Sequence, residues 1–167
     1  MPLLLDAQEK WDDFLENKIT NYEKLRNFDY GPTNKSSVSK LSPYISHRVL
    51  FEYELLEEVK KKYHSQKINK FVEEIYWRIY WQGWMENRPK VWFNFISEKN
   101  YEYDFETYEK AINGNSELGF FNSWVNELKT YNYLHNHTRM WFASTWIFNL
   151  GLPWQLGASF FFKHLYD

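Results

Sequence analysis

The sequence has no cysteine and only six glycines and five prolines among 167 residues, and each scarcity removes a class of protein. Without cysteine there can be no disulfide, no cysteine-ligated iron–sulfur cluster and no thiolate-bound zinc. A low content of glycine and proline is untypical of disordered or collagen-like chains. No apolar run reaches the length of a membrane-spanning helix, and the leucines at positions 3–5 are too few for a signal-peptide core. We therefore expect a soluble, cytoplasmic protein without a membrane partner.

Aromatic side chains are abundant instead, with nine Trp, thirteen Tyr and fourteen Phe making up 22% of the residues. A chain of this length suits one domain that buries about two-thirds of the surface of its unfolded state. Apolar residues recur at intervals of three and four almost throughout, as in amphipathic helices, and no convincing strand or repeat is present. We predict an all-α helical bundle that forms a single domain over residues 1–167.

The helix boundaries follow from this spacing and from start and stop signals. Asp6 and the Ser42-Pro43 pair are expected starts, and Pro89 is an expected stop. A less regular aromatic segment is expected from there to about Asn113. The expected helices span about residues 6–26, 48–64, 67–87, 121–131, 136–149 and 153–166.

The net charge of −2 hides an uneven distribution along the chain. Residues 1–34 and 91–167 each carry an excess of three negative charges, whereas residues 35–90 carry eleven Lys and Arg against seven Glu. The middle third is therefore the expected place for a polyanionic partner. The run Lys60 to Lys62 is explained equally well as a solvated helix end, where cations complement the helix dipole.

A polar loop, "DYGPTNKSSVSK", separates the first two expected helices from Asp29 to Lys40. Its Gly, Pro, Asn and Ser residues favour turns and supply hydroxyl and amide donors. Loops with such a density of donors often hold anions, so this loop is a candidate anion site.

The stretch "EEIYWRIYWQGW" places Glu74, Trp77, Arg78 and Trp81 on one helical face. Facing a cavity, this strip would offer a ring for stacking on a base, a carboxylate acceptor and a phosphate partner. Facing the core or water, it would be an ordinary amphipathic helix with an intrahelical Glu74–Arg78 pair. The spacing by itself favours the ordinary interpretation.

The stretch "YLHNHTRM", from Tyr133 to Met140, places two imidazoles, an amide and a guanidinium within one and a half helical turns. A buried Arg139 would need a carboxylate such as Asp167. A metal site is not expected, because His135 and His137 would point about 200° apart on a helix unless the helix began after them. His135 is better explained as a hydrogen-bonded structural residue.

Four blocks of the sequence resemble, in matching order, the helical flavin-binding region of the DNA photolyase and cryptochrome family. They are "NYEKLRNF", "SVSKLSPYI", "EEIYWR" and "YLHNHTRM". The last segment, "LPWQLGASFFFKHLYD", is similar to a further helix of that region, so the resemblance covers about residues 20–167. One block alone would be weak, but four in register are a specific signal.

The resemblance implies FAD as the cofactor. A dinucleotide pyrophosphate suits hydroxyl and backbone donors, and a nearby cation and amide can tune the flavin ring. Asp167 is implied as the acidic partner of Arg139. The residues that the resemblance assigns to FAD are Tyr22, Ser39, Lys40, Leu41, Ser42, Asn136, Arg139 and Asp167.

The resemblance also implies a light-driven DNA repair lyase. In the family, an electron passes from reduced FAD to a flipped pyrimidine dimer in DNA, the dimer splits, and the electron returns. Glu74 and Trp77 would seat the lesion, and Trp154 resembles the middle member of a tryptophan electron relay. The implied DNA contacts are Arg26, Arg78 and His137.

The sequence departs from the family at several points. His137 stands where the family has an arginine, and the window of the surface relay tryptophan offers only Tyr101, Tyr103 and Tyr108. The antenna domain and the segment that completes the flavin site do not occur in the sequence, so we expect an incomplete domain without a second chromophore. Two alternatives to the enzyme remain. One is a non-catalytic, cryptochrome-like module that binds flavin or nucleic acid, and the other is one half of a split flavoprotein completed by a second chain.

Overall fold

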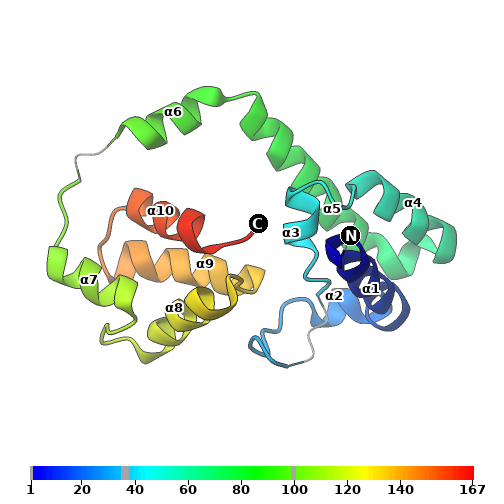
Figure 1. Ribbon diagram of the computed structural model, residues 1–167, viewed down its shortest axis with the longest axis horizontal. Coiled ribbons are helices and arrows are strands. Elements are labelled where there is room, and N and C mark those ends of the chain that lie inside the picture. Colours follow the sequence, from blue (N-terminus) through cyan, green and yellow to red (C-terminus); the bar gives the residue numbers. More distant parts are fainter. Residues whose placement is uncertain (1, 35–37, 99–100) are drawn as a thin grey trace. The chain divides into compact units, whose positions relative to one another are not determined.

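The computed structural model describes residues 2–34, 38–98 and 101–167 (Figure 1). Throughout these ranges the regular structure is helical, with no strand, which confirms the predicted all-α fold. The chain divides into two compact units. Unit 1 contains the described residues of 1–28 and 35–91 together with Asp167, and unit 2 contains residues 29–34 and 92–166.

Unit 1 is built around the long helix α5. Its apolar face carries Ile68, Phe71 and Ile75 at intervals of three and four, and all three side chains are buried, as the spacing predicts. Beyond Ile75, every residue of α5 is half-buried or exposed. The elements of unit 1 are α1 (Pro2–Asn17), η1 (Ile19–Asn21), α2 (Tyr22–Leu25), α3 (Ser42–Ser46), α4 (Glu52–Lys62) and α5 (Ser65–Glu86).

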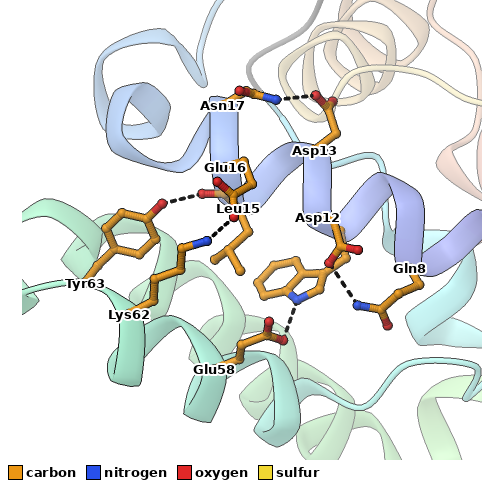
Figure 2. A network of polar contacts seen from close by, with 10 residues as sticks. Gln8, Asp12, Asp13, Leu15, Glu16, Asn17, Glu58, Lys62 and Tyr63 are labelled. Carbon is orange, nitrogen blue, oxygen red and sulfur yellow. Dashed lines mark hydrogen bonds and ion pairs between the residues drawn. The ribbon is translucent and has the colours of Figure 1, made fainter.

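The core of unit 1 is aromatic. The Phe14 and Phe71 rings lie 5.1 Å apart between centroids, and Trp11 donates its indole N–H to Glu58 at 2.7 Å. At the contact between α1 and α4, Tyr63 donates its hydroxyl to the Leu15 carbonyl at 2.6 Å (Figure 2). Buried rings with satisfied polar groups give this unit a defined packing.

The first expected helix is interrupted. α1 begins at Pro2 rather than Asp6, because Asp6 binds Lys10 one turn later, at 2.6 Å, within the helix. Lys18 leaves the helical region with φ −125°, and a 3₁₀ turn then leads into the short α2. The β-branched Ile19 and Thr20 that follow have low helix propensity, which suits a break at this point.

Unit 2 also corrects one expectation. The segment predicted to be irregular contains two helices, and Pro89 starts the first of them. Asp104 caps the second by accepting the Thr107 N–H at 3.0 Å, and Gly114, with φ 68°, ends it. The elements that follow α5 are α6 (Pro89–Ser97), α7 (Phe105–Asn113), α8 (Gly119–Tyr131), α9 (Asn136–Ser144), the π-helix η2 (Thr145–Asn149) and α10 (Trp154–His164).

The core of unit 2 surrounds Trp146, which is 1% exposed. Its ring lies 6.0 Å from Phe142 and 6.1 Å from Phe160, and its N–H donates to the Pro153 carbonyl at 2.9 Å. A Cβ atom at Gly157 would come within 3.1 Å of the indole, so glycine permits this close approach of α10. Within the described residues, no helix is long and apolar enough to span a bilayer.

Candidate functional site

The first cluster of predicted site residues joins α2 to α5 in unit 1. Arg26 Nη1 lies 2.6 Å from Glu74 Oε1, and Lys70 Nζ lies 3.3 Å from the same oxygen. The Arg26 guanidinium also lies 5.9 Å from the centroid of the Tyr22 ring. Burial raises the pKa of Tyr22 to about 12, because the ionised phenol would lose its hydration. Three of the predicted residues, Tyr22, Arg26 and Glu74, are thus brought together.

A second cluster surrounds the buried carboxylate of Glu52. Arg78 Nε lies 3.4 Å from Glu52 Oε1, and Arg48 Nη1 lies 3.3 Å from Oε2. Arg78 also donates to the Ser46 hydroxyl at 2.6 Å. Glu74 and Arg78 therefore pair with other elements rather than with each other. Two guanidiniums on one carboxylate leave a net positive charge beside α5.

Glu52 and Ser46 are partners that the sequence analysis missed. Glu52 precedes Arg78 by 26 residues, so no local spacing rule connects them. The only sequence signal is the excess of basic residues in this part of the chain. A charged residue at the start of a helix does not by itself reveal a buried position.

The turn that resembles a phosphate-binding motif leads into α3. The Ser39 hydroxyl accepts the Leu41 N–H at 3.4 Å, and Lys40 adopts a left-handed conformation with φ 55°. Leu41 is 1% exposed and anchors the turn in the core of unit 1. Ser42 begins α3, so two hydroxyls and one ammonium lie within four residues. The part of the predicted anion loop at positions 35–37 lies outside the described residues.

The stretch "YLHNHTRM" forms the start of α9 in unit 2. His135 is the N-cap, and its Nδ1 accepts the His137 N–H at 3.2 Å. The helix therefore begins after His135, contrary to the continuous helix assumed above, and His135 is buried in a structural role. In the described part of the chain, no group of three or more His, Asp or Glu side chains is arranged to hold a metal ion.

Arg139 is half-buried and is oriented by its neighbours on unit 2. Its Nε donates to the Leu134 carbonyl at 2.9 Å, and its guanidinium lies 5.4 Å from the centroid of the Tyr133 ring. Asn136, one turn earlier, is exposed. A backbone carbonyl and an aromatic ring therefore hold the guanidinium in place.

A further contact in unit 2 was missed from the sequence. The Thr138 hydroxyl donates to Asp29, and the other oxygen of that carboxylate accepts the Gly31 N–H at 2.9 Å. The Asp-x-Gly pattern was a usable turn signal, whereas its long-range bond to α9 was not. This contact ties residues 29–34 to the helix that carries Asn136.

Trp154 begins α10 and remains half exposed. Its ring stacks on Phe95, with centroids 5.8 Å apart and planes at 25°. Phe95 in turn lies 5.6 Å from Trp92, so Trp154 belongs to an aromatic row in unit 2. The proposed relay role of Trp154 is a prediction about electron transfer.

The predicted residues are divided between the units. Asp167 belongs to unit 1 and Arg139 to unit 2, so their pairing remains a prediction. The roles assigned to individual residues remain predictions as well. Unit 1 holds Tyr22, Arg26, Ser39, Lys40, Leu41, Ser42, Glu74, Trp77, Arg78 and Asp167, and unit 2 holds Asn136, His137, Arg139 and Trp154.

Comparison with known proteins agrees with the motifs. No protein-family model matches the sequence. A deoxyribodipyrimidine photo-lyase of Agrobacterium fabrum is 25% identical over 171 residues, which cover 96% of this chain and 34% of the relative. A cryptochrome DASH of Idiomarina loihiensis is 24% identical over 140 residues, which cover 79% of this chain and 31% of the relative.

Solved structures show the same likeness at the level of the fold. A bacterial class III photolyase from Agrobacterium tumefaciens matches 98% of the chain with a TM-score of 0.81 at 23% identity. A Synechocystis cryptochrome matches 98% of the chain with a TM-score of 0.84 at 22% identity. The resemblance to the photolyase and cryptochrome family is confirmed.

The photolyase-like chain spans about a third of its relatives, since it covers 35% of each of the two solved structures. The matched third is helical in this protein, as the motifs predict. At these identities the solved structures establish the photolyase and cryptochrome fold.

Proposed function

We propose that the chain supplies FAD-binding and DNA-binding residues for light-driven repair of pyrimidine dimers, as a deoxyribodipyrimidine photo-lyase. The observation that carries the proposal is the match to a photolyase over 98% of the chain, because that match includes all four motif blocks. The implied partner is DNA that contains pyrimidine dimers.

The donor chemistry of the chain fits FAD. Ser39 and Ser42 offer hydroxyls and Lys40 a cation within four residues, which suits a diphosphate. Arg139 would hold negative charge near the flavin ring, and Asn136 would orient it through its amide. When bound, reduced and excited by light, FAD supplies the electron for dimer splitting.

The residues of α5 would hold the lesion. The Trp77 ring is 54% exposed, so it can stack on a pyrimidine and exclude water from one of its faces. Glu74 would accept a hydrogen bond from the base, and Arg26 and Arg78 would hold phosphates. The Arg26–Glu74 pair would then have to open, because both groups are engaged with each other at 2.6 Å.

A second candidate function is a cryptochrome-like module that binds flavin and nucleic acid without repair. The TM-score of 0.84 to a cryptochrome supports this alternative. The decisive experiment incubates the protein with FAD and dithionite, adds ultraviolet-irradiated oligothymidylate, and counts dimers after blue light. Light-dependent loss of dimers that Glu74→Ala abolishes supports the lyase. Retained dimers despite bound FAD contradict the lyase and leave the binding module.

Arg78→Ala is expected to lower the slope of log affinity for DNA against log salt by about one, because one phosphate contact is lost. Fluorescence anisotropy with irradiated oligothymidylate at several salt concentrations measures this slope. Arg48→Ala is the matched control, since Arg48 binds the same Glu52 carboxylate at 3.3 Å. Equal changes in both variants would show a general charge effect and contradict a phosphate contact at Arg78.

A further inference from the structure

The outer half of α5 carries a continuous row of aromatic side chains. Trp77, Tyr80, Trp81 and Trp84, here called the α5 stripe, are spaced so that they share one face of the helix. Successive ring centroids lie 5.7, 5.3 and 5.8 Å apart, each pair in an edge-to-face arrangement. The stripe is thus a preformed array of rings on a regular helix.

These rings are largely uncovered. Trp77, Tyr80 and Trp81 are 54%, 55% and 54% exposed. The core of unit 1 uses α5 only as far as Ile75, so packing within that unit does not account for the stripe. Edge-to-face contact uses the edge of one ring and leaves other ring faces open to a flat ligand. An uncovered aromatic surface of this kind is typical of a binding site.

The charge around the stripe is strongly positive. Residues 60–90 contain eight Lys and Arg against three Glu, an excess of five positive charges. Lys70 pairs with Glu73 at 3.0 Å and with Glu74 at 3.3 Å, which neutralises part of the negative charge. The Arg88 guanidinium lies 4.4 Å from the centroid of the Trp84 ring, at the end of the stripe. Cations therefore adjoin the rings.

We propose that the α5 stripe stacks the bases of single-stranded nucleic acid while the neighbouring cations hold its phosphates. Rings interleaved with basic side chains are the arrangement that binds single strands without sequence preference. Paired bases do not expose their faces, so a duplex cannot use the stripe. A protein partner fits less well, because lysine is depleted from protein interfaces.

This inference deepens the proposed nucleic-acid binding and shares Trp77 with it. It adds Tyr80, Trp81, Trp84 and Arg88, to which neither the motifs nor the comparisons assign a role. From Trp77 to Arg88 the helix rises roughly 16 Å, enough for a few nucleotides. The stripe would hold the strand beside the lesion, and its substrate is therefore unpaired DNA or RNA.

The test uses the full chain and a fluorescein-labelled oligothymidylate of about twelve nucleotides, with a blunt duplex of equal length for comparison. Trp81→Ala and Trp84→Ala are each expected to weaken oligothymidylate binding by about fivefold to a hundredfold. The salt dependence should stay unchanged, because no phosphate contact is removed. Trp81→Tyr should restore most of the affinity.

Tyr53→Ala is the matched control, since Tyr53 is 62% exposed on α4, outside the stripe. Unchanged oligothymidylate affinity in both tryptophan variants, with helicity retained by circular dichroism, overturns the inference. An equal loss of duplex binding also overturns it. So does a dimer in sedimentation that both variants dissociate, because the stripe would then join two copies of the chain.

The same variants separate this inference from the proposed function. FAD binding should be unaffected by Trp81→Ala and Trp84→Ala. A wild-type protein that binds oligothymidylate through the stripe but neither binds FAD nor repairs dimers would contradict the proposed function and leave this inference standing.

Discussion

Trp146→Ala is expected to lower the free energy of unfolding of unit 2 by about 3–5 kcal/mol, the usual cost of deleting a fully buried large ring. The indole is 1% exposed and packs between Phe142 and Phe160. Its loss leaves a cavity, and the Pro153 carbonyl loses the N–H that it accepts at 2.9 Å. Urea denaturation followed by far-ultraviolet circular dichroism measures the change.

Trp141→Ala is the control for this prediction. Trp141 lies on α9, close in sequence to Trp146, but is 49% exposed, so its removal should cost less than about 1 kcal/mol. Trp146→Phe should cost an intermediate amount, about 1–2 kcal/mol, because the ring contacts largely remain while the hydrogen bond is lost. Equal destabilisation by Trp141→Ala and Trp146→Ala would contradict the described core of unit 2.

The stability of the wild-type chain is expected to fall by about 2.7 kcal/mol through Tyr22 alone as the pH rises from 10 to about 12. Burial raises the pKa of this phenol from 10.0 to about 12 in the folded state. Between these values the unfolded chain has lost the proton and the folded chain retains it. The contribution is therefore complete below the lower pKa and is lost as the pH passes through the higher one.

Tyr22→Phe isolates this effect, because it keeps the ring that packs on Phe14 and Phe71 at 5.8 and 5.5 Å. Urea denaturation of both proteins across this pH range gives the difference in slope. Lysines with raised pKa values, such as Lys10 and Lys70, contribute equally to both proteins and cancel. Parallel pH profiles for the two proteins would contradict a buried Tyr22 hydroxyl.

Helical periodicity predicted those parts of the fold in which one helix face is buried. In α5, Ile68, Phe71 and Ile75 follow the pattern and are buried as expected. The pattern gave no clear answer over α6, where Trp92 and Phe93 are exposed although aromatic. Apolar spacing marks a helix only where the apolar residues face a core, so exposed rings hide the period.

The candidate site was predictable in its residues but not in its pairings. Sequence motifs brought forward Arg26, Glu74 and Arg78, yet not the Arg26–Glu74 pair, whose members are 48 residues apart. The buried position of Glu52 beneath Arg78 was also invisible, because a carboxylate in the first turn of a helix is ordinarily a surface feature. Contacts between distant residues follow from tertiary packing, which local rules do not encode.

FAD binding by the purified chain tests the central claim most directly. Titration of the protein into FAD, followed by flavin fluorescence, should give a saturable change. Arg139→Ala and the double variant Ser39→Ala with Ser42→Ala should each weaken this binding about tenfold or more, since each removes hydrogen bonds to a charged group. Lys129→Ala, which removes a cation elsewhere in unit 2, should leave it unchanged. No saturable change with the wild-type chain, or equal weakening in all three variants, would contradict the account.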